Sequence, residues 1–401
     1  MKNQPQSLPQ PQSQSQSLPR VQGRSRDRAP ARVRTVLVSG GGIAGPVLAH
    51  WLRRHGFAPT VVERAPGPRA GGQAVDVRGV ALDVMERTGL LERARAARTR
   101  MRGMSVLDAD GRELHRSTEA TYSSGRLDGE DIEVLREDLV RMVHEHTRED
   151  VEYLFGDSVT GLEEDGDGVR VDFARGASRR FDLVVGADGL HSTVRRLAFG
   201  PEEEYSHHLG SYLSVFGADN FLGLEDWQTW LRDGDVGFGI MPVRDNTELR
   251  VAFGFASEPL APELRTGDAL RRTVAEKLEG VAWEGEALAE AARKAPDFYC
   301  DAMAQIRMDH WSRGRVVLLG DAGYCPSPLS GQGTSLALVG AYVLADSLAR
   351  HAGDHRAAFA RYEDRMRPFV ELNQALATEN PGGPASEESV EHAKNALSLD
   401  A

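Results

Sequence analysis

Short apolar runs alternate with amphipathic segments along most of this chain, and the alternation predicts an α/β protein. Residues 33–38 form an apolar run rich in β-branched side chains, which is typical of a buried parallel strand. Residues 44–55 follow with apolar positions at helical spacing, and a second short strand is predicted at 60–62. Further strands are expected at 182–186 and 315–320, and further helices at 79–98, 135–148, 331–350 and 354–377.

The middle of the chain has a different pattern, because short strand-like pieces replace most of the helices. Residues 103–116 predict a hairpin, and two more strands are expected near 151–160 and 168–174. Residues 205–256 alternate in short strand-like pieces, and helices near 266–279 and 285–293 follow them. The pattern therefore predicts α/β sections interleaved with a β-rich section.

Composition excludes several classes of protein. The 401 residues are enough for two domains with a sizeable core. The 60 acidic and 48 basic residues give a net charge of −12, which argues against a nucleic-acid partner. The two cysteines, Cys300 and Cys325, cannot form a disulfide framework and fit a reducing compartment, so we expect a cytoplasmic protein. Because no apolar run reaches about 18 residues, no membrane span is predicted.

The two ends of the chain differ from the rest. Residues 1–32 are rich in Gln, Ser, Pro and then Arg, with few apolar residues, and we expect a disordered tail. Its arginines could contact a partner, although a solvated tail is the simpler interpretation. Residues 381–401 begin with Pro-Gly-Gly-Pro and are expected to form a flexible C-terminal tail.

A glycine-rich turn follows the first predicted strand. Gly40, Gly42 and Gly45 match the G-x-G-x-x-G pattern, in which the glycines allow a tight turn, the approach of a pyrophosphate, and close packing of the next helix. Ala44 lies in the first turn of that helix, whose N–H groups and positive dipole end attract phosphate. Glu63 ends the second strand 18 residues after Gly45, where it can accept hydrogen bonds from a ribose. The turn and its flanking elements predict a dinucleotide-binding site.

Two further motifs follow predicted buried strands. The stretch from Asp182 to Gly186 leads into Asp188-Gly189 and then Arg195. The last strand leads into Gly320-Asp321 and, after Pro328, into Gly331-Gln332-Gly333. Each motif has a structural alternative, since Asp188 could form an ordinary turn and Asp321 could cap a helix. The order and spacing of all three motifs are more specific than any one of them.

With these motifs, residues 33–375 resemble the single-component FAD-dependent aromatic hydroxylases, the para-hydroxybenzoate hydroxylase-like flavoprotein monooxygenases. The resemblance is closest to the short members, which include the tetracycline-inactivating monooxygenases. It implies that the first motif binds the ADP half of FAD, that Asp321 contacts the ribityl–pyrophosphate part, and that the second motif lies near FAD and NAD(P)H. Arg136 matches a family arginine that reaches the phosphates, although it could also be a solvated helix residue. The cofactor-binding residues predicted in this way are Gly40, Gly42, Ala44, Gly45, Glu63, Arg64, Arg69, Asp76, Arg136, Asp188, Arg195, Asp321, Gly331 and Gly333.

The third motif departs from the family pattern at several positions. The usual Ala-His after Gly-Asp-Ala is Gly323-Tyr324 here, the later Asn is Ser335, and the acidic residue that follows is Gly340. These changes put in doubt the surroundings of the flavin and any proton path carried over from the family.

The resemblance implies a fold class and a division into domains. We expect a Rossmann-like FAD-binding domain of the glutathione-reductase type, interleaved with a β-sheet substrate domain. The FAD-binding domain would comprise residues 33–76, 99–200 and 300–380, and the substrate domain residues 77–98 and 201–299. The substrate would lie between the flavin and residues 205–256, whose aromatic and apolar side chains could form a pocket.

The resemblance also implies the activity. We expect an FAD-dependent monooxygenase that uses NAD(P)H and O2 to insert one oxygen atom into an aromatic or polyketide-like small molecule, through a flavin C4a-hydroperoxide. The five arginines between Glu92 and Arg102 are compatible with the 2′-phosphate of NADPH, although a solvated helix face explains them too. No nucleophile–base–acid set and no metal-ligand cluster is found, so the chemistry would be flavin-centred and no metal is expected. A flavin-dependent oxidase or dehydrogenase on the same fold, and a non-enzymatic FAD-binding protein, are the alternatives. Hydroxylation and Baeyer–Villiger insertion both stay open, as does the choice between monomer and homodimer.

Overall fold

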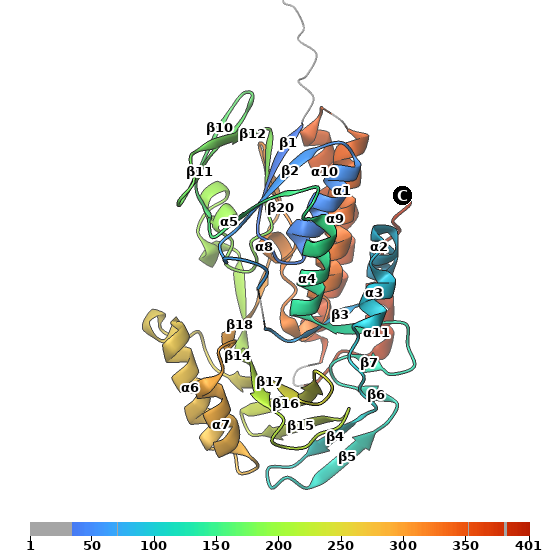
Figure 1. Ribbon diagram of the computed structural model, residues 1–401, viewed down its shortest axis with the longest axis vertical. Helices are drawn as coiled ribbons and strands as arrows, with labels where there is room; N and C mark the ends of the chain where they lie inside the picture. Colours follow the sequence, from blue (N-terminus) through green and yellow to red (C-terminus); the bar gives the residue numbers. More distant parts are fainter. Residues whose placement is uncertain (1–33, 70, 352, 381–382) are drawn as a thin grey trace, which may run out of the picture. The chain divides into compact units, whose positions relative to one another are not determined.

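The computed structural model describes residues 34–69, 71–351, 353–380 and 383–401, and it is built on two main sheets (Figure 1). The predicted tail at 1–32 lies outside the described residues. The first sheet has six strands in the order β19-β20-β13-β1-β2-β9, of which all but β19 run parallel. Its strands are β1 (Thr35–Ser39), β2 (Ala58–Glu63), β9 (Glu152–Phe155), β13 (Leu183–Gly186), β19 (Ser312–Arg313) and β20 (Val316–Leu318).

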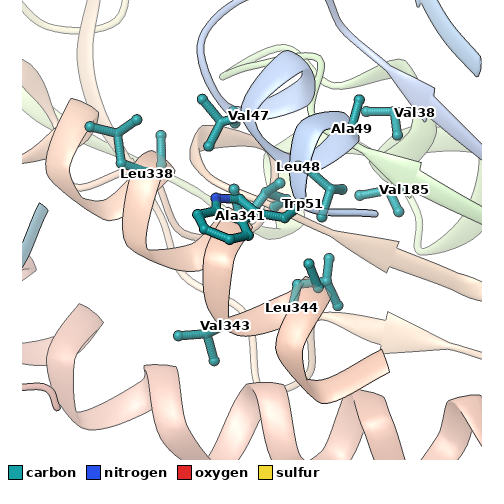
Figure 2. Close-up of a cluster of buried hydrophobic side chains, with 14 of the residues drawn as sticks. Val38, Val47, Leu48, Ala49, Trp51, Val185, Leu338, Ala341, Val343 and Leu344 are labelled. Atoms are coloured by element: carbon teal, nitrogen blue, oxygen red, sulfur yellow. The ribbon is translucent and has the colours of Figure 1, made fainter. Parts of the chain in front are cut away.

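Helices pack against the six-stranded sheet because its strands are apolar on both faces. The central pair, α1 and α9, contact each other along much of their length, and Figure 2 shows Leu48 and Trp51 of α1 beside Ala341 and Leu344 of α9. The buried strands of such a sheet are expected to be apolar throughout, as β1 and β13 are. The helices of this half are α1 (Ala44–Arg54), α2 (Val80–Thr88), α3 (Leu91–Ala96), α4 (Arg136–Thr147), α5 (Thr193–Ala198), α8 (Asp321–Tyr324), α9 (Gly333–Arg350) and α10 (His355–Glu379).

The second sheet has seven strands in the order β18-β14-β17-β16-β15-β4-β5. Two helices, α6 (Gly267–Glu279) and α7 (Gly285–Lys294), bury their apolar sides on one face of this sheet, against Phe216, Phe238 and Phe253. The opposite face contacts the first half, where Met241 and Val243 pack on Leu135. Its strands are β4 (Met104–Leu107), β5 (Glu113–Ser117), β14 (Ser206–Asp219), β15 (Gln228–Asp233), β16 (Val236–Val243), β17 (Glu248–Ala256) and β18 (Tyr299–Ile306).

Smaller elements complete the fold. A three-stranded sheet joins β10, β11 and β12, and two short antiparallel pairs join β3 with β8 and β6 with β7. The bounds of these strands are β3 (Ala74–Val77), β6 (Ala120–Thr121), β7 (Gly125–Arg126), β8 (Ile132–Leu135), β10 (Val159–Asp165), β11 (Gly168–Phe173) and β12 (Arg179–Phe181). The remaining helices are the 3₁₀ turns η1 (Glu202–Glu204), η2 (Pro262–Arg265) and η3 (Pro328–Ser330), and the last helix α11 (Glu387–Lys394). Within the described ranges, no helix has both the length and the hydropathy needed to cross a membrane.

The structure differs from the predicted division of the chain at three places. Residues 77–98, expected in the substrate domain, pack against α9 in the core of the six-stranded half. Residues 104–117, expected in the FAD-binding domain, pair with β15 and extend the seven-stranded sheet, and β18 belongs to that sheet as well. The single helix predicted at 79–98 is two helices, because Gly89 adopts a left-handed conformation (φ 81°) that ends α2.

The C-terminal residues also differ from expectation. Instead of a flexible tail, residues 387–394 form α11, and Ala393 and Leu399 are buried against the body of the protein. Asn373 of α10 donates a hydrogen bond to the carbonyl of Ala393, and Lys394 forms an ion pair of 2.8 Å with Asp131. A few anchoring contacts therefore fix a segment whose composition alone suggests disorder.

Candidate functional site

The three sequence motifs lie at one edge of the six-stranded sheet. The parallel register places Ser39, Gly186 and Leu318, the last residues of their strands, side by side. The loops that follow these strands are the three motifs, so they emerge next to one another. Ligands of open α/β sheets bind at this carboxyl edge.

The glycines of the first motif are required by close contacts. Gly40 has φ 117°, and a Cβ atom on it would lie 2.2 Å from the carbonyl oxygen of Ala187 in the second motif. A Cβ on Gly45 would lie 2.0 Å from the carbonyl oxygen of Gly40, so only glycine lets α1 start this close to the turn. At Gly42 the nearest atom would be Nη2 of Arg136 at 3.7 Å, and the space is otherwise open. The turn is therefore tight on its protein side and open on the side of Gly42.

The start of α1 suits an anion. No acidic residue lies in its first turn, and no side chain caps it. Glu63 ends β2 beside this turn, where Oε2 accepts a hydrogen bond of 2.7 Å from the Gly41 N–H and Oε1 accepts one of 2.8 Å from the Ala65 N–H. These N–H groups position the carboxylate at the rim of the turn, as a ribose contact requires.

Charged groups from separate elements meet in front of the turn. The pKa of Arg136, at the start of α4, is lowered by burial and then by Arg69, while Asp321, Tyr299 and Glu63 act in the opposite direction. Among the described residues, its guanidinium makes no hydrogen bond and no ion pair. We call the space beside Arg136, Arg69, Asp321, Tyr299 and Glu63 the hollow, because Asp321 and Tyr299 are exposed there although nearby protein is close enough to raise their pKa values. Arg64, next to Glu63, is exposed at the surface.

Asp321 lies in the same hollow. It is the first residue of α8, directly after Gly320, whose φ of 64° turns the chain out of the sheet. Its carboxylate is exposed, yet protein surrounds it closely enough for burial to raise its pKa, and Cys325 and Arg136 only partly offset that effect. A Cβ on Gly333 would lie 3.9 Å from Asp321 Oδ1, so the glycine keeps the backbone near the carboxylate. An accessible acid in a deep hollow is suited to bind hydroxyl groups.

These residues fit FAD. The open side of Gly42, the start of α1 and the unpaired Arg136 suit a pyrophosphate, and Asp321 and Glu63 suit the hydroxyl groups on either side of it. Gly331 has φ 66° and ends η3 just before α9. Asp76 lies in a different cluster, where it forms an ion pair of 2.8 Å with Arg78.

The second motif makes contacts that are mainly structural. Asp188 caps α5, because its Oδ2 accepts hydrogen bonds from the N–H groups of Thr193 (2.9 Å) and Val194 (3.1 Å). Arg195 has no exposed surface, and it donates to the carbonyl oxygens of Leu190 and Ala322 and to Glu202. Arg195 therefore joins the second motif to the third. Direct contact of either residue with a cofactor stays a prediction.

Sequence reasoning missed a chain of polar side chains that leads away from the hollow. The hydroxyl of Tyr299 donates to Oδ2 of Asp301 (3.0 Å), and the same oxygen lies 2.8 Å from Nε2 of His191. Glu202 lies 2.8 Å from Nδ1 of His191, and the two carboxylates raise the pKa of this histidine to about 10. His191 lies inside the second motif, which is the only signal that could have pointed to it.

The residues of the third motif that differ from the family pattern make two separate sets of contacts, one at Tyr324 and Gly340 and one at Ser335. Tyr324 is buried, and its hydroxyl lies 2.8 Å from that of Tyr362, which donates to the carbonyl of Leu318. A Cβ on Gly340 would lie 2.2 Å from the Tyr324 hydroxyl, so the tyrosine fills the space that a side chain at 340 would need. Ser335 accepts a hydrogen bond of 3.1 Å from the N–H of Arg78.

The arginines near residue 92 do not gather into one site. Arg93 pairs with Glu145, Arg95 with Glu92, and the Arg102 guanidinium contacts the carbonyl of Glu225, all at the exposed surface. The solvated interpretation accounts for these three residues. Among the residues that the structure describes, no group of three or more His, Cys, Asp or Glu side chains is arranged to hold a metal ion.

The face of the seven-stranded sheet opposite α6 and α7 has a flat centre. Successive residues of a strand point to opposite faces, so Gly237 and Gly239 of β16 share this face with Met241. Gly254 of β17 lies beside Gly237, and the ring of Trp230 lies over Gly239, its cross-strand partner. The centre of this face therefore carries little side-chain volume, with larger side chains around it.

Comparison with known proteins agrees with this geometry. Residues 34–376 match the family model described as an FAD binding domain. The chain is 50% identical to a protein of Mycobacterium tuberculosis over 92% of this chain and 99% of that protein. It is 38% identical to a flavin-dependent monooxygenase of Legionella longbeachae, over 84% of this chain and 86% of the relative. The crystal structure of tetracycline destructase Tet(55) superimposes with a TM-score of 0.81 at 36% identity, over 92% of this chain and 98% of that one. The chain therefore belongs to the FAD-binding-domain family and is an FAD-dependent monooxygenase.

Proposed function

We propose that this enzyme uses NAD(P)H, with NADPH favoured, and O2 to insert one oxygen atom into a flat aromatic or polyketide-like small molecule. The observation that carries the proposal is the flat part of the seven-stranded sheet around Gly237 and Gly254, beside the Trp230 ring that lies over Gly239, on the face turned toward the FAD-binding half. A planar molecule can lie on such a surface without displacing side chains, and Trp230 and Met241 at its edge offer apolar contact.

The residues of the hollow would hold the cofactor. Arg136 and the first turn of α1 would bind the FAD pyrophosphate, Glu63 the ribose, and Asp321 the ribityl chain. Bound FAD supplies the redox chemistry and the activation of O2, for which the chain itself carries no group. The part of the protein is to orient the substrate on the sheet and to exclude water from the reacting centre. The two cysteines in the sequence support a cytoplasmic location as a further part of the proposal.

The proposal is tested by NADPH oxidation and O2 uptake across a panel of aromatic and polyketide compounds, with product masses measured. Because two of the similar solved structures are tetracycline destructases, tetracycline is the first compound to test. We expect substrate-stimulated NADPH oxidation and a product heavier by one oxygen atom. The variant Gly237→Leu, which adds a large side chain to the flat centre, should raise KM for the substrate while FAD stays bound. Release of peroxide alone with every compound would instead favour the oxidase alternative.

A further inference from the structure

A buried charged cluster lies outside the cofactor hollow, between the two sheets. It consists of Asp76 on β3, Arg78 directly after β3, and Glu133 on β8. Asp76 and Glu133 are cross-strand partners in the antiparallel β3–β8 pair, so their side chains lie next to each other on one face. About a tenth of the Asp76 and Arg78 side chains is exposed, and Glu133 is more deeply buried.

The hydrogen bonds of this cluster are specific. Nη2 of Arg78 donates to Oδ2 of Asp76 (2.8 Å) and to the carbonyl oxygen of Ser123 (2.8 Å). Glu133 accepts a hydrogen bond of 2.6 Å from the hydroxyl of Thr99. The buried Nε of Arg78 has no partner in the part of the chain that the structure describes. The cluster therefore contains two carboxylates, one guanidinium, and one unused donor.

The charge of this cluster does not balance if both acids ionise. The neighbouring Asp131 is paired with Lys394 of α11, which also pairs with Glu391, so Lys394 gives the cluster no spare positive charge. The other polar groups that contact the cluster, Ser123 of the β6–β7 loop and Ser335 of α9, are neutral. Two buried carboxylates would then share a single guanidinium, and a shared low-dielectric site of this kind retains a proton.

We propose that Asp76 and Glu133 share one proton at neutral pH, and that Arg78 holds this proton-bearing pair against the Gly331 loop as an acid for a bound molecule. The pKa directions agree with the geometry. Burial raises the pKa of Asp76 to about 7. Arg78 acts against this shift, whereas Glu133 and Asp131 add to it. Burial also raises the pKa of Glu133, against the hydrogen bonds from Ser123 and Thr99 and the charge of Arg78.

The position of Arg78 connects the pair to the candidate site. A Cβ on Gly331 would lie 3.7 to 3.9 Å from the guanidinium atoms of Arg78, and the Arg78 N–H bonds Ser335 at the start of α9. Arg78 also contacts Ser123, whose hydroxyl accepts a hydrogen bond of 2.6 Å from Gln228. The side-chain oxygen of Gln228 accepts one of 3.0 Å from the Trp230 indole. The pair thus lies between the third motif and the substrate face of the sheet.

The proton balance of the proposed role is simple. The pair gives its proton to a base brought beside Gly331, which leaves both carboxylates ionised with Arg78 as their counter-charge, and a proton from solvent restores the pair. That this base belongs to bound cofactor or substrate rests on the proposed function. The shared proton itself is a property of the protein alone and can be measured without turnover.

The test is infrared spectroscopy of the full-length, flavin-free protein, titrated from about pH 5 to about pH 9, a range that begins above the ordinary carboxyl pKa values of about 4. We expect the carbonyl band of a protonated carboxylic acid to disappear with a midpoint near 7. Asp76→Asn should remove the part of this band that titrates near 7, because Glu133 then has no second carboxylate beside it, although burial still raises the pKa of Glu133. Glu133→Gln should remove or lower the same titration, and it provides the test if Asp76→Asn does not fold.

Two further variants separate charge from structure. Arg78→Gln should raise the midpoint by about 1–3 units, which is the effect of an adjacent opposite charge, whereas Arg78→Lys should keep it within about one unit. Asp83→Asn, on the exposed side of α2, is the matched control and should leave the titration unchanged. Absence of a protonated carboxyl near neutral pH in the wild-type protein overturns the proposal, as does a band that persists in both acid variants. If the band is present but no compound is oxygenated, only the proposed function fails.

Discussion

Adding a single methyl group to Gly42 should separate cofactor binding from folding. In the protein alone, the new Cβ of Gly42→Ala would meet only Arg136 Nη2, at an ordinary contact distance of 3.7 Å. The backbone at Gly42 is not in the left-handed region, so the flavin-free protein should be as stable as wild type, or more stable by about 0.4–1 kcal/mol because alanine restricts the unfolded chain.

FAD binding should respond differently to the same change. The methyl group would occupy the open side of the turn, where the pyrophosphate has to approach. Overpacking of one methyl group costs about 1–3 kcal/mol, which corresponds to a Kd for FAD about 5- to 150-fold higher. At a concentration of FAD that stabilises the wild type by about 2.7 kcal/mol, a 30-fold weaker Kd would leave about 0.9 kcal/mol.

Gly45→Ala is the matched comparison for this prediction. Its Cβ would lie 2.0 Å from the Gly40 carbonyl oxygen, so α1 must move and the flavin-free protein itself should lose stability. The assay removes the flavin, measures thermal unfolding of the three proteins, and then titrates FAD by calorimetry. If Gly42→Ala binds FAD as tightly as wild type, or loses as much stability as Gly45→Ala without FAD, the assignment of the open side of the turn to the pyrophosphate is wrong.

Three further outcomes are expected. Burial lowers the pKa of His50 from 6.5 to about 4, with help from His146 and Arg54, so stability is fully present above pH 6.5 and declines between pH 6.5 and 4. The 2.5 pH units correspond to at most about 3.4 kcal/mol of stability, reduced to about 1–2 kcal/mol because His50 is partly exposed. His50→Asn should flatten this part of a curve of unfolding free energy against pH, whereas His310→Asn, at an exposed histidine, should not. Asp188→Ala should lower the free energy of unfolding in urea by about 1–2 kcal/mol through loss of the α5 cap, and an unchanged urea midpoint would contradict the capping role. In stopped-flow traces, the same variant should slow flavin reduction by NAD(P)H more than flavin reoxidation. Arg195→Met should destabilise the protein by about 3–5 kcal/mol because Glu202 and two carbonyl groups lose their donor, and a loss under 1 kcal/mol would show that the two motifs do not depend on it.

The local parts of the site could be predicted from the sequence. The turn from Gly40 to Gly45 and the acid at Glu63 follow from strand, glycine and helix signals that lie within one stretch of chain. The structure places them where those signals predict, and Arg136 and Asp321 face the same hollow. Short-range rules are enough for the turn and Glu63 because these lie on the consecutive elements β1, α1 and β2, whereas Arg136 and Asp321 were predicted from the family resemblance.

The parts that could not be predicted depend on distant partners. Residues 104–117 form the expected hairpin, but nothing within it specifies pairing with β15, more than a hundred residues later. The helix α11 is polar and short, and it is held by contacts with Asp131 and Asn373 that its own sequence does not reveal. Likewise, Glu133 is an ordinary charged residue in the sequence, and only strand pairing shows that it shares a buried site with Asp76.

The contact between Tyr324 and Gly340 makes one of these two residues depend on the other. With any side chain at 340, the tyrosine hydroxyl would meet an atom 2.2 Å away, so a tyrosine introduced first would be excluded from its pocket beside Tyr362. Loss of the side chain at 340 only opens a small space and is tolerable by itself. In this packing, tyrosine at 324 therefore depends on glycine at 340. The pair should transfer together into a relative that has the usual histidine and acidic residue, whereas transfer of the tyrosine alone should fail.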